Sequence, residues 1–322
     1  MAAIVATVIG DPCGIGPEVV LKALADAQGR GVVGRPLLIG SLAALDKTRT
    51  ACGVDIALRA VDAVGAARFE PGVIDVLDVF PLDPAQVEFG RASAACGQAV
   101  LHWLQTAERL GRAGAVQATI MAPIDSTALR LTGKLNELDD LQPAGTWLLR
   151  VSGRLRVVPV AEHVLMRDVP ATVTRDRVLG LLRVLNDTLK RFGLARPRLA
   201  VAGLNPHAMG PEEREQIAPA VEQARCEGIV AAGPVSADAV FRQCLEGRYD
   251  AVVSMYHDQG QIAVKTAAFE GACSIYIGLP YVHLSIPHGS AYDIAGKGTA
   301  QHKSMLAAML TAAALAQVRG FP

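Results

Sequence analysis

Short apolar runs alternate with longer helical patterns along most of the chain. One helical pattern begins at about Pro17, with a proline and then Glu18 where helices begin, and Ser41 is suited to cap another. The apolar runs predicted as strands lie at residues 3–9, 35–39, 115–121, 155–161, 198–204 and 250–256. Strands alternating with helices are typical of βαβ units, so the pattern predicts an α/β fold with a mostly parallel sheet.

Composition and charge narrow the class of protein. Hydrophobic residues make up 51% of the 322 positions and aromatic residues only 4%, which favours helices packed on a parallel sheet. The 31 basic and 31 acidic residues balance and form no block of like charge, so neither nucleic acid nor membrane is expected as a partner. The six cysteines lack a CxxC pair, and no apolar run reaches the ~18 residues of a membrane span. We expect a reduced, cytoplasmic protein.

Three of the seven histidines share one position relative to the predicted strands. His163, His207 and His257 each lie just after an apolar run, where α/β sheets bind ligands. Neutral imidazoles suit zinc best, with cobalt, nickel, manganese or magnesium as alternatives, and three protein ligands leave room for a substrate. Separate loop histidines with local hydrogen bonds are the alternative interpretation.

Two charged residues accompany the third histidine. Asp258 is suited to orient His257 or to bind a metal, and Lys265 to take a proton from an alcohol, so both are candidate catalytic residues. A solvated surface lysine is the common alternative for Lys265.

Two glycine-rich segments are candidate cofactor sites. The segment GDPCGIGPE, residues 10–18, lets the backbone turn sharply and approach a ligand, but it lacks the GxGxxG pattern and a tight structural turn explains it equally. The segment HGSAYDIAGKG, residues 288–298, offers small residues and an acid that favours NAD over NADP, or is simply a loop before a helix. The candidate cofactor-binding residues are Gly14, Gly16, His288, Gly289, Ser290, Ala291 and Asp293.

In order along the chain, GDPCGIGPE, MAP (121–123), EHVLMRDVP, GLNPHA (203–208), GPVSAD (233–238), YHDQG (256–260), GLP (278–280) and HGSAYDIAG resemble one known family. The chain is similar to the 4-hydroxythreonine-4-phosphate dehydrogenases of pyridoxal phosphate biosynthesis. The resemblance implies a two-lobed α/β/α fold like that of isopropylmalate and isocitrate dehydrogenases, with the active site in the cleft between lobes. The implied lobes are approximately 1–123 plus 276–322 and 124–275.

The resemblance also implies a site and a reaction. It implies a homodimer with the active site shared across the interface, in which the partner subunit donates the third of the metal ligands. Substrate contacts would include Asp238, Asp258 and Lys265. The implied activity is NAD-linked, metal-dependent oxidation of a β-hydroxy acid followed by loss of carbon dioxide, within the EC 1.1.1 class.

The chain departs from the family pattern where the family binds its phosphorylated substrate. A GHTE-type motif is replaced by Gly133-Lys134-Leu135-Asn136-Glu137, and an expected lysine by Ser126. An asparagine and an arginine align with Ser274 and His283, which, like Lys134, are candidate substrate residues. Losing an arginine removes a bidentate phosphate contact.

The pattern therefore leaves the substrate open. One candidate is 4-phosphohydroxy-L-threonine, and the alternative is an unphosphorylated acid such as a cis-dihydrodiol carboxylate of terephthalate breakdown, whose dehydrogenases perform the same chemistry. A redox-silent metal hydrolase or lyase, which would not bind NAD, is a second class of function. A non-catalytic binding homologue is a third.

Overall fold

The computed structural model describes residues 2–28, 34–135, 138–267, 272–286 and 288–322. The chain divides into two compact units: unit 1 is residues 1–144 with 279–322, and unit 2 is residues 145–278. The lobe predicted from the sequence as 124–275 differs from unit 2 at both ends, and residues 124–144 fall in unit 1. Among the described residues, no helix is long and apolar enough to cross a membrane.

Unit 1 contains a parallel sheet. Its strands follow the order β3 (Ala57–Val61), β4 (Val73–Leu77), β2 (Arg35–Ile39), β1 (Ile4–Val8), β5 (Ala118–Met121) and β12 (Val282–Ser285). Every residue of β1 is buried, as expected for a central strand covered on both faces. The α/β class predicted from the alternation of apolar runs is confirmed.

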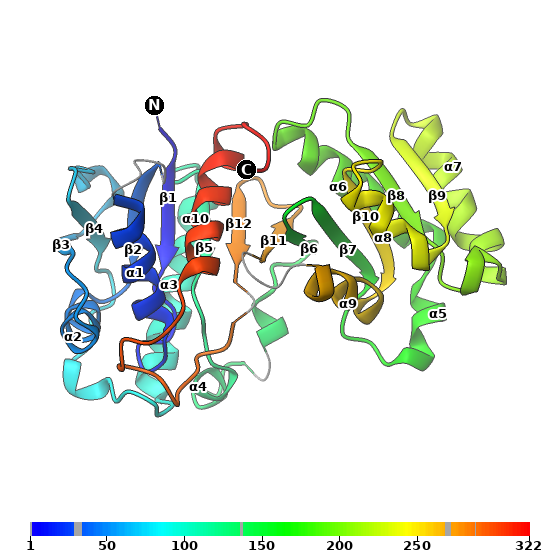
Figure 1. Cartoon of the computed structure of the whole chain (residues 1–322). Coiled ribbons are helices and arrows are strands. Elements are labelled where there is room, and N and C mark those ends of the chain that lie inside the picture. Colours follow the sequence, from blue (N-terminus) through cyan, green and yellow to red (C-terminus); the bar gives the residue numbers. More distant parts are fainter. Residues whose placement is uncertain (1, 29–33, 136–137, 268–271, 287) are drawn as a thin grey trace. The chain divides into compact units, whose positions relative to one another are not determined.

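Helices cover both faces of the unit 1 sheet, with α1 and α10 on one face and α3 on the other (Figure 1). The helices are α1 (Gly16–Gln28), α2 (Leu42–Cys52), α3 (Ala94–Arg112), α4 (Ser126–Arg130) and α10 (Lys303–Ala316). Ser41 caps α2 as predicted, since its hydroxyl accepts a hydrogen bond from the Ala44 amide. The short helix α4, which lies in unit 1, packs on α3, where the Ala128 carbonyl fills the space beside Gly97.

Unit 2 contains a mixed sheet. Its strands follow the order β11 (Cys273–Ile277), β6 (Trp147–Ser152), β7 (Leu155–Ala161), β10 (Ala251–Tyr256), β8 (Arg198–Ala202) and β9 (Val230–Val235). Strand β6 is antiparallel to β11 and β7, whereas β7, β10, β8 and β9 run parallel. The helices are α5 (Val169–Thr172), α6 (Arg175–Arg191), α7 (Ala218–Cys226), α8 (Ala237–Leu245) and α9 (His257–Ala267).

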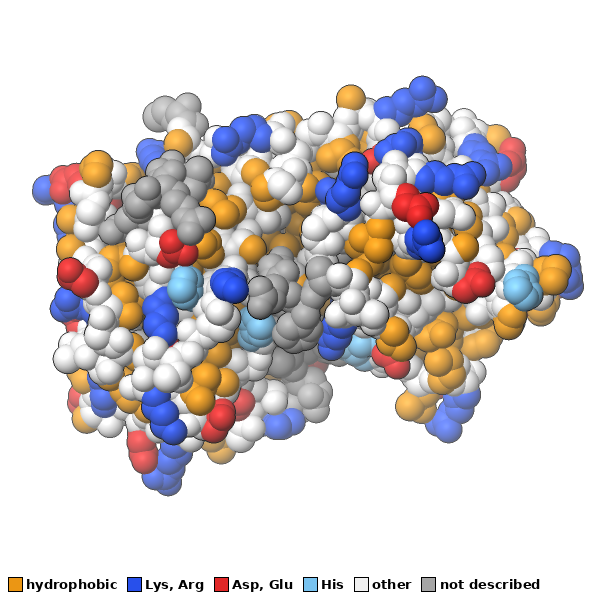
Figure 2. Space-filling model, viewed as in Figure 1, with side chains coloured by type: hydrophobic (Ala, Val, Ile, Leu, Met, Phe, Trp, Pro, Cys, Tyr) orange, Lys and Arg blue, Asp and Glu red, His pale blue; other side chains and the backbone are white. Residues whose placement is uncertain are grey.

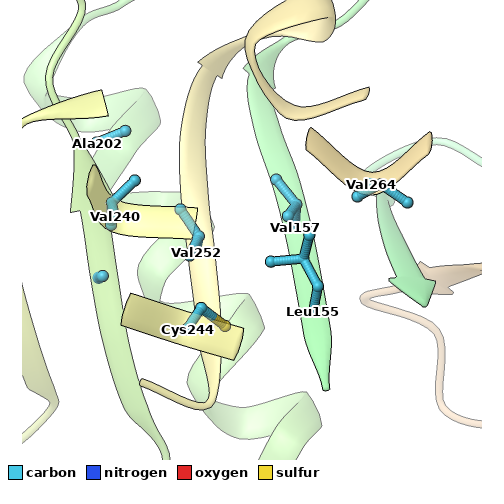
Figure 3. Close-up of a cluster of buried hydrophobic side chains, with 8 residues drawn as sticks. Leu155, Val157, Ala202, Val240, Cys244, Val252 and Val264 are labelled. Carbon is cyan, nitrogen blue, oxygen red and sulfur yellow. The ribbon is translucent and has the colours of Figure 1, made fainter. Parts of the chain in front are cut away.

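A compact apolar core joins the unit 2 sheet to helices α8 and α9. Figure 3 shows Val240 and Cys244 of α8 and Val264 of α9 directed at the strands. The strand side chains of this cluster are Leu155, Val157, Ala200, Ala202 and Val252, all fully buried. On the visible face of the molecule, acidic and basic side chains are interspersed, in keeping with the balanced charge (Figure 2). Burial of the apolar side chains of this core holds the parallel strands in register and thereby fixes where each strand ends.

Candidate active site

The carboxyl ends of four neighbouring strands of unit 2 carry most of the predicted polar residues. Strand β7 ends at Ala161, just before Glu162 and His163, and β10 ends at Tyr256, just before His257. Strand β8 leads to His207, and β9 leads to Asp238. Because the four strands are parallel, all these residues leave the sheet at the same edge.

His163 and His257 lie side by side, because β7 and β10 are neighbours in the sheet. Their ring centroids are 5.0 Å apart, and the rings are inclined by 50°. One nitrogen of each ring and one oxygen of Glu162 all lie within 4.8 Å of one another. Two imidazoles and a carboxylate this close form a donor set that fits a divalent metal. Sequence reasoning overlooked Glu162, although it adjoins a predicted ligand.

A buried arginine fixes the carboxylate of Glu162. The two terminal nitrogens of Arg150, on β6, donate to the two oxygens of Glu162 at 2.7 and 3.0 Å. The side chains of Arg150 and Glu162 are only 7% and 17% exposed, so solvent screens this pair weakly. Ser274 lies opposite Arg150 in the β11–β6 ladder and is half-buried. The structure therefore places this predicted substrate residue beside the arginine.

His257 opens helix α9 and interacts with its neighbour. Its Nδ1 lies 2.7 Å from an Oδ1 oxygen of Asp258. When Nδ1 carries the proton, it donates to Asp258 and leaves Nε2 to bind a metal, which is the orienting role expected of a carboxylate beside a ligand. Lys265 lies eight residues further along α9, about 12 Å along the helix axis. Its side chain is exposed, and the structure does not bring it to the histidine pair within one chain.

His207 lies in a different environment. It follows β8 in a turn with a left-handed backbone (φ 56°), and it is outside the group formed by Glu162, His163 and His257 in the described part of one chain. Buried Glu213 holds this turn by accepting from the Leu204 and Asn205 amides at 2.7 Å.

Exposed Asp238 lies near His207. A hydrogen bond from the Ser236 hydroxyl is the main cause that lowers the pKa of Asp238, and the charge of His207 contributes. The polar residues of the strand ends thus form two groups, one around His163 and His257 and the other around His207 and Asp238.

The two glycine-rich segments lie against each other in unit 1. The Ile15 amide donates to the Ser290 carbonyl at 2.9 Å, and a Cβ at Gly14 would lie 2.7 Å from the Ser290 Cβ. A Cβ at Gly16 would lie 2.6 Å from the Ile9 carbonyl oxygen. Contacts with the chain itself therefore account for Gly14 and Gly16, as the structural-turn interpretation requires, and their cofactor role stays a prediction.

The later segment keeps features that fit a flat cofactor. A Cβ at Gly289 would meet none of the described atoms within 4 Å, and Asp293 is exposed. Burial lowers the pKa of half-buried His288, and Ala291 adopts a positive φ of 42°. The Ser290 hydroxyl is buried without a hydrogen-bond partner among the described residues. The open surface beside Gly289 and the exposed carboxylate of Asp293 fit a nucleoside with ribose hydroxyls.

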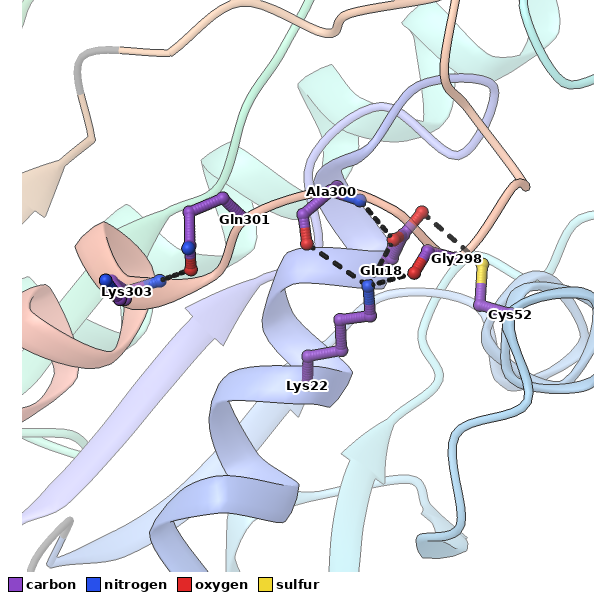
Figure 4. A network of polar contacts seen from close by, with 7 residues as sticks. All are labelled: Glu18, Lys22, Cys52, Gly298, Ala300, Gln301 and Lys303. Carbon is purple, nitrogen blue, oxygen red and sulfur yellow. Dashed lines mark hydrogen bonds and ion pairs between the residues drawn. The ribbon is translucent and has the colours of Figure 1, made fainter.

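A buried ion pair anchors the far end of this segment (Figure 4). Lys22 donates to Glu18 at 2.7 Å and to the Gly298 and Ala300 carbonyls at 2.6 and 3.1 Å. Glu18, which is fully buried, also accepts from the Ala300 amide at 2.8 Å. The bonds from Lys22 and to Glu18 fix Gly298 and Ala300 on helix α1, because the buried Glu18 carboxylate must keep both Lys22 and the Ala300 amide as partners.

The remaining predicted substrate residues lie in unit 1. His283 is within β12, where its Nδ1 is 2.7 Å from the Thr119 hydroxyl. Burial lowers the pKa of His283 to about 4, so at neutral pH it lacks the charge of the arginine that the family pattern has there. Lys134 is exposed in a turn after α4, and Glu137 lies outside the described residues.

A second group of metal-binding side chains lies inside unit 1. The thiols of Cys13 and Cys96 are 3.5 Å apart, and both are fully buried with Asp11 beside them. The Asp11 carboxylate already accepts from the Cys13 amide at 2.9 Å and from the Tyr292 hydroxyl at 2.5 Å. Burial raises the pKa of Asp11 and of Tyr292. With both oxygens occupied by the chain's own donors, this group links the two glycine-rich segments structurally.

Comparison with known proteins places the chain in a family. The profile of the family described as pyridoxal phosphate biosynthetic protein PdxA matches residues 33–312. The chain belongs to the PdxA family. Like the named relatives, it is a dehydrogenase. The family resemblance inferred from the sequence motifs is thereby confirmed.

Individual relatives match over almost the whole chain. A protein of Novosphingobium aromaticivorans, provisionally named 4-hydroxythreonine-4-phosphate dehydrogenase, is 43% identical over 99% of this chain and 96% of its own length. The D-threonate 4-phosphate dehydrogenase of Salmonella typhimurium is 38% identical over 97% of this chain and 98% of its own. These two relatives carry different substrates in their names, so identity at this level leaves the substrate open.

Solved structures agree with this assignment. The 4-hydroxythreonine-4-phosphate dehydrogenase of Klebsiella pneumoniae has a TM-score of 0.89 and 35% identity, with 98% of this chain and 99% of that chain covered. A terephthalate 1,2-cis-dihydrodiol dehydrogenase of Burkholderia xenovorans has a TM-score of 0.71 and 31% identity, covering 96% and 97%. The fold is thus shared by dehydrogenases that are named for phosphorylated and for unphosphorylated substrates.

Proposed function

We propose that this protein catalyses the NAD-linked, divalent-metal-dependent oxidation and decarboxylation of a β-hydroxy acid, 4-phosphohydroxy-L-threonine or a related compound. The observation that carries the proposal is the close group of Glu162, His163 and His257 at the strand ends of unit 2. A hydroxyl proton and a hydride leave the substrate, and NAD when bound accepts the hydride; carbon dioxide then leaves, and the resulting enolate takes up a proton. A divalent ion when bound supplies a Lewis acid that polarises the substrate hydroxyl.

The chain's own residues have distinct roles in this proposal. His163, His207 and His257 hold the ion, zinc by preference, and Asp258 orients the His257 ring through the 2.7 Å contact to Nδ1. Lys265 accepts the hydroxyl proton, and Asp238 contacts the substrate. Ser274, Lys134 and His283 contact the remainder of the substrate. The exposure of His163 and Asp238 supports these roles, since a substrate can reach them.

We propose that the site is completed in a homodimer. Within one chain His207 and Lys265 lie apart from the histidine pair, so a second copy is the natural source of the missing groups. Exposed apolar side chains support this arrangement, because they follow the three histidines closely in the sequence. They are Val164, Leu165 and Met166 after His163, Met209 after His207, and Ile262 after His257, with exposures from 41% to 74%. Large exposed apolar side chains near a site mark interaction surfaces.

NAD is the proposed redox cofactor, and the segment from His288 to Gly298 its adenosine site. The carboxylate of Asp293 supports NAD over NADP, because an acid accepts ribose hydroxyls and repels a 2′-phosphate. The pair formed by Glu18 and Lys22 holds the end of this segment in place.

An unphosphorylated hydroxy acid is the second candidate substrate. The specific observation is His283, which is neutral at physiological pH because its pKa is lowered to about 4. A neutral imidazole cannot replace the bidentate, charge-assisted contacts that an arginine makes with a phosphate. A cis-dihydrodiol carboxylate, the substrate type of the relative from Burkholderia xenovorans, has no phosphate for such a cation to bind.

NADH absorbance tests the proposal directly. The purified protein is incubated with NAD and zinc, manganese or magnesium, and with 4-phosphohydroxy-L-threonine, D-threonate 4-phosphate or a cis-dihydrodiol carboxylate in turn. We expect NADH with one of these acids. Absence of NADH with every β-hydroxy acid, in protein shown to contain metal, contradicts the dehydrogenase proposal, and a thermal shift with NAD separates this result from a redox-silent metal enzyme.

A further inference from the structure

Asp258 contacts only the Nδ1 side of His257, whereas an oxygen of Glu162 lies within 4.8 Å of a nitrogen of both His163 and His257. We propose that Glu162 is itself a ligand of the ion at this site, so that one chain offers two imidazoles and one carboxylate. This inference rests on the proposed function, because it assigns a further ligand to the metal that function requires.

The first support is distance. The donor atoms of Glu162, His163 and His257 are within 4.8 Å of one another without any ion present. Ligand atoms on one ion with bonds of about 2.0–2.2 Å lie roughly 3–3.5 Å apart. Side-chain rotations that move the donor atoms by about an ångström therefore bring all three within reach of one ion. His207 does not enter this group in one chain, so the carboxylate is the third donor at hand.

The second support is the way in which Arg150 holds the carboxylate. A carboxylate offers about four lone-pair directions, and Arg150 occupies one on each oxygen. The remaining lone pairs are available to an ion. Since the Arg150 side chain is only 7% exposed on a central strand, it keeps the oxygens of Glu162 in place beside the imidazoles.

A comparison within unit 2 separates this arrangement from an ordinary ion pair. Glu227 also pairs with an arginine through two hydrogen bonds, from Arg183 at 2.6 and 2.7 Å. Glu227 lies at the end of α7 and belongs to neither group of metal-binding side chains among the described residues. Of these two bidentate pairs, only that of Glu162 has imidazole nitrogens beside the carboxylate.

An added carboxylate changes which ion the site prefers. Carboxylate oxygens suit manganese and other harder ions, whereas imidazoles suit zinc, and two histidines with one carboxylate are a typical set for iron(II). We therefore expect Glu162 to raise the affinity for manganese more than that for zinc.

Metal titration of the whole protein tests this assignment without NAD or substrate. Bound manganese is measured by electron paramagnetic resonance and zinc by calorimetry, for the wild type, Glu162→Gln and the matched control Glu227→Gln. We expect Glu162→Gln to weaken manganese binding at least about tenfold, since even residues that only orient ligands change affinity 10- to 100-fold. Zinc binding should weaken less, and Glu227→Gln should match the wild type for both ions.

Each outcome decides the matter. If folded Glu162→Gln binds manganese within twofold of the wild type, Glu162 is only the partner of Arg150 and the inference fails, while the proposed function stands. If the wild type binds no divalent ion, both fail. Should Glu162→Gln not fold, Glu162→Asp keeps a charge beside Arg150 but withdraws the oxygens, and unchanged manganese affinity in that variant overturns the assignment.

Discussion

The turns after β1 in unit 1 and after β7 and β10 in unit 2 occupy the same kind of position in a parallel sheet, but they are built differently. After β1, small residues let the chain fold against itself, and Gly14 and Gly16 leave no room for a Cβ. After β7 and β10, imidazole and carboxylate groups leave the sheet beside one another. The first turn is closed by its own backbone, whereas the second presents donors to a ligand.

This difference teaches which sequence signals imply a ligand. Glycines at a strand end indicate that a ligand or another part of the chain approaches the backbone closely. In unit 1 the segment around Ser290 makes this approach. Imidazole and carboxylate groups that converge at neighbouring strand ends are the stronger signal, because together they form a donor set that fits a metal ion.

The largest effect should follow removal of an imidazole from unit 2. His163→Ala should abolish metal binding and lower kcat/KM by roughly 10³–10⁴-fold, because the ion supplies several kcal/mol of transition-state stabilisation. The side chain is exposed, so the free energy of unfolding should change by less than ~0.5 kcal/mol. Metal analysis and NADH formation measure the first effect, and urea unfolding the second. Retention of a full complement of metal in the variant would remove His163 from the site.

Breaking the buried pair in unit 1 should have the next largest effect, on stability. Lys22→Met leaves the fully buried Glu18 carboxylate without its cation, which should destabilise the protein by about 3 kcal/mol. It also frees the end of the 288–298 segment, so the Kd for NAD should rise. Arg242→Met is the matched control, because its pair with Glu246 is also four residues apart but exposed, and it should cost less than ~0.5 kcal/mol. Equal unfolding midpoints for the two variants would contradict the account of this anchor.

A methyl group tests the closed turn more finely. Gly14→Ala places a Cβ against Ser290 and should cost about 1–3 kcal/mol, through overpacking. Gly289→Ala, in the facing segment, enters open space and should change stability by less than ~0.5 kcal/mol. Thermal unfolding of both variants measures the difference. If Gly289→Ala also abolishes NAD binding while its stability stays unchanged, the open space beside Gly289 is confirmed as a cofactor surface. Equal destabilisation by the two substitutions would contradict the account of the closed turn.

The smallest expected effect is a pH dependence from His283. Its pKa is lowered from 6.5 to about 4 in the folded protein, so the unfolded chain binds a proton first as the pH falls. Above pH 6.5 His283 is mostly neutral in both the folded and the unfolded chain, so its lowered pKa costs little stability. As the pH falls from 6.5 towards 4, only the unfolded chain gains the proton, and the free energy of unfolding decreases progressively. Between pH 7 and pH 6 the loss should be about 0.7 kcal/mol. Urea unfolding of the wild type and His283→Gln at both pH values should show this difference only in the wild type.

The sequence predicted the strand ends well, because an apolar run and its polar end are local features. Strand β2 and strand β7 have the predicted bounds, and β10 begins one residue later than expected. Which strand ends lie together is not local, since β10 lies between β7 and β8 although it follows both in the chain. The sequence therefore suggested three converging histidines, whereas one chain brings together only His163 and His257.

Glu162 was missed for the same physical reason. Its partner Arg150 lies on β6, which is antiparallel to β7, and no apolar run identified that strand in the sequence. Likewise, the sequence identified the glycines of residues 10–18 but not the group that fills the space beside Gly14, because Ser290 is far along the chain. Long-range packing decides between a ligand and a structural contact at such a turn.

The central claim, a metal-dependent dehydrogenase site at the strand ends of unit 2, is tested most directly by titrating metal into chelated protein while following NADH. With the substrate found to be active, the account predicts no NADH without metal and a rate that rises with bound ion up to one per chain. The His163→Ala variant should stay inactive at every metal concentration. A full rate of NADH formation in metal-free protein would contradict the account.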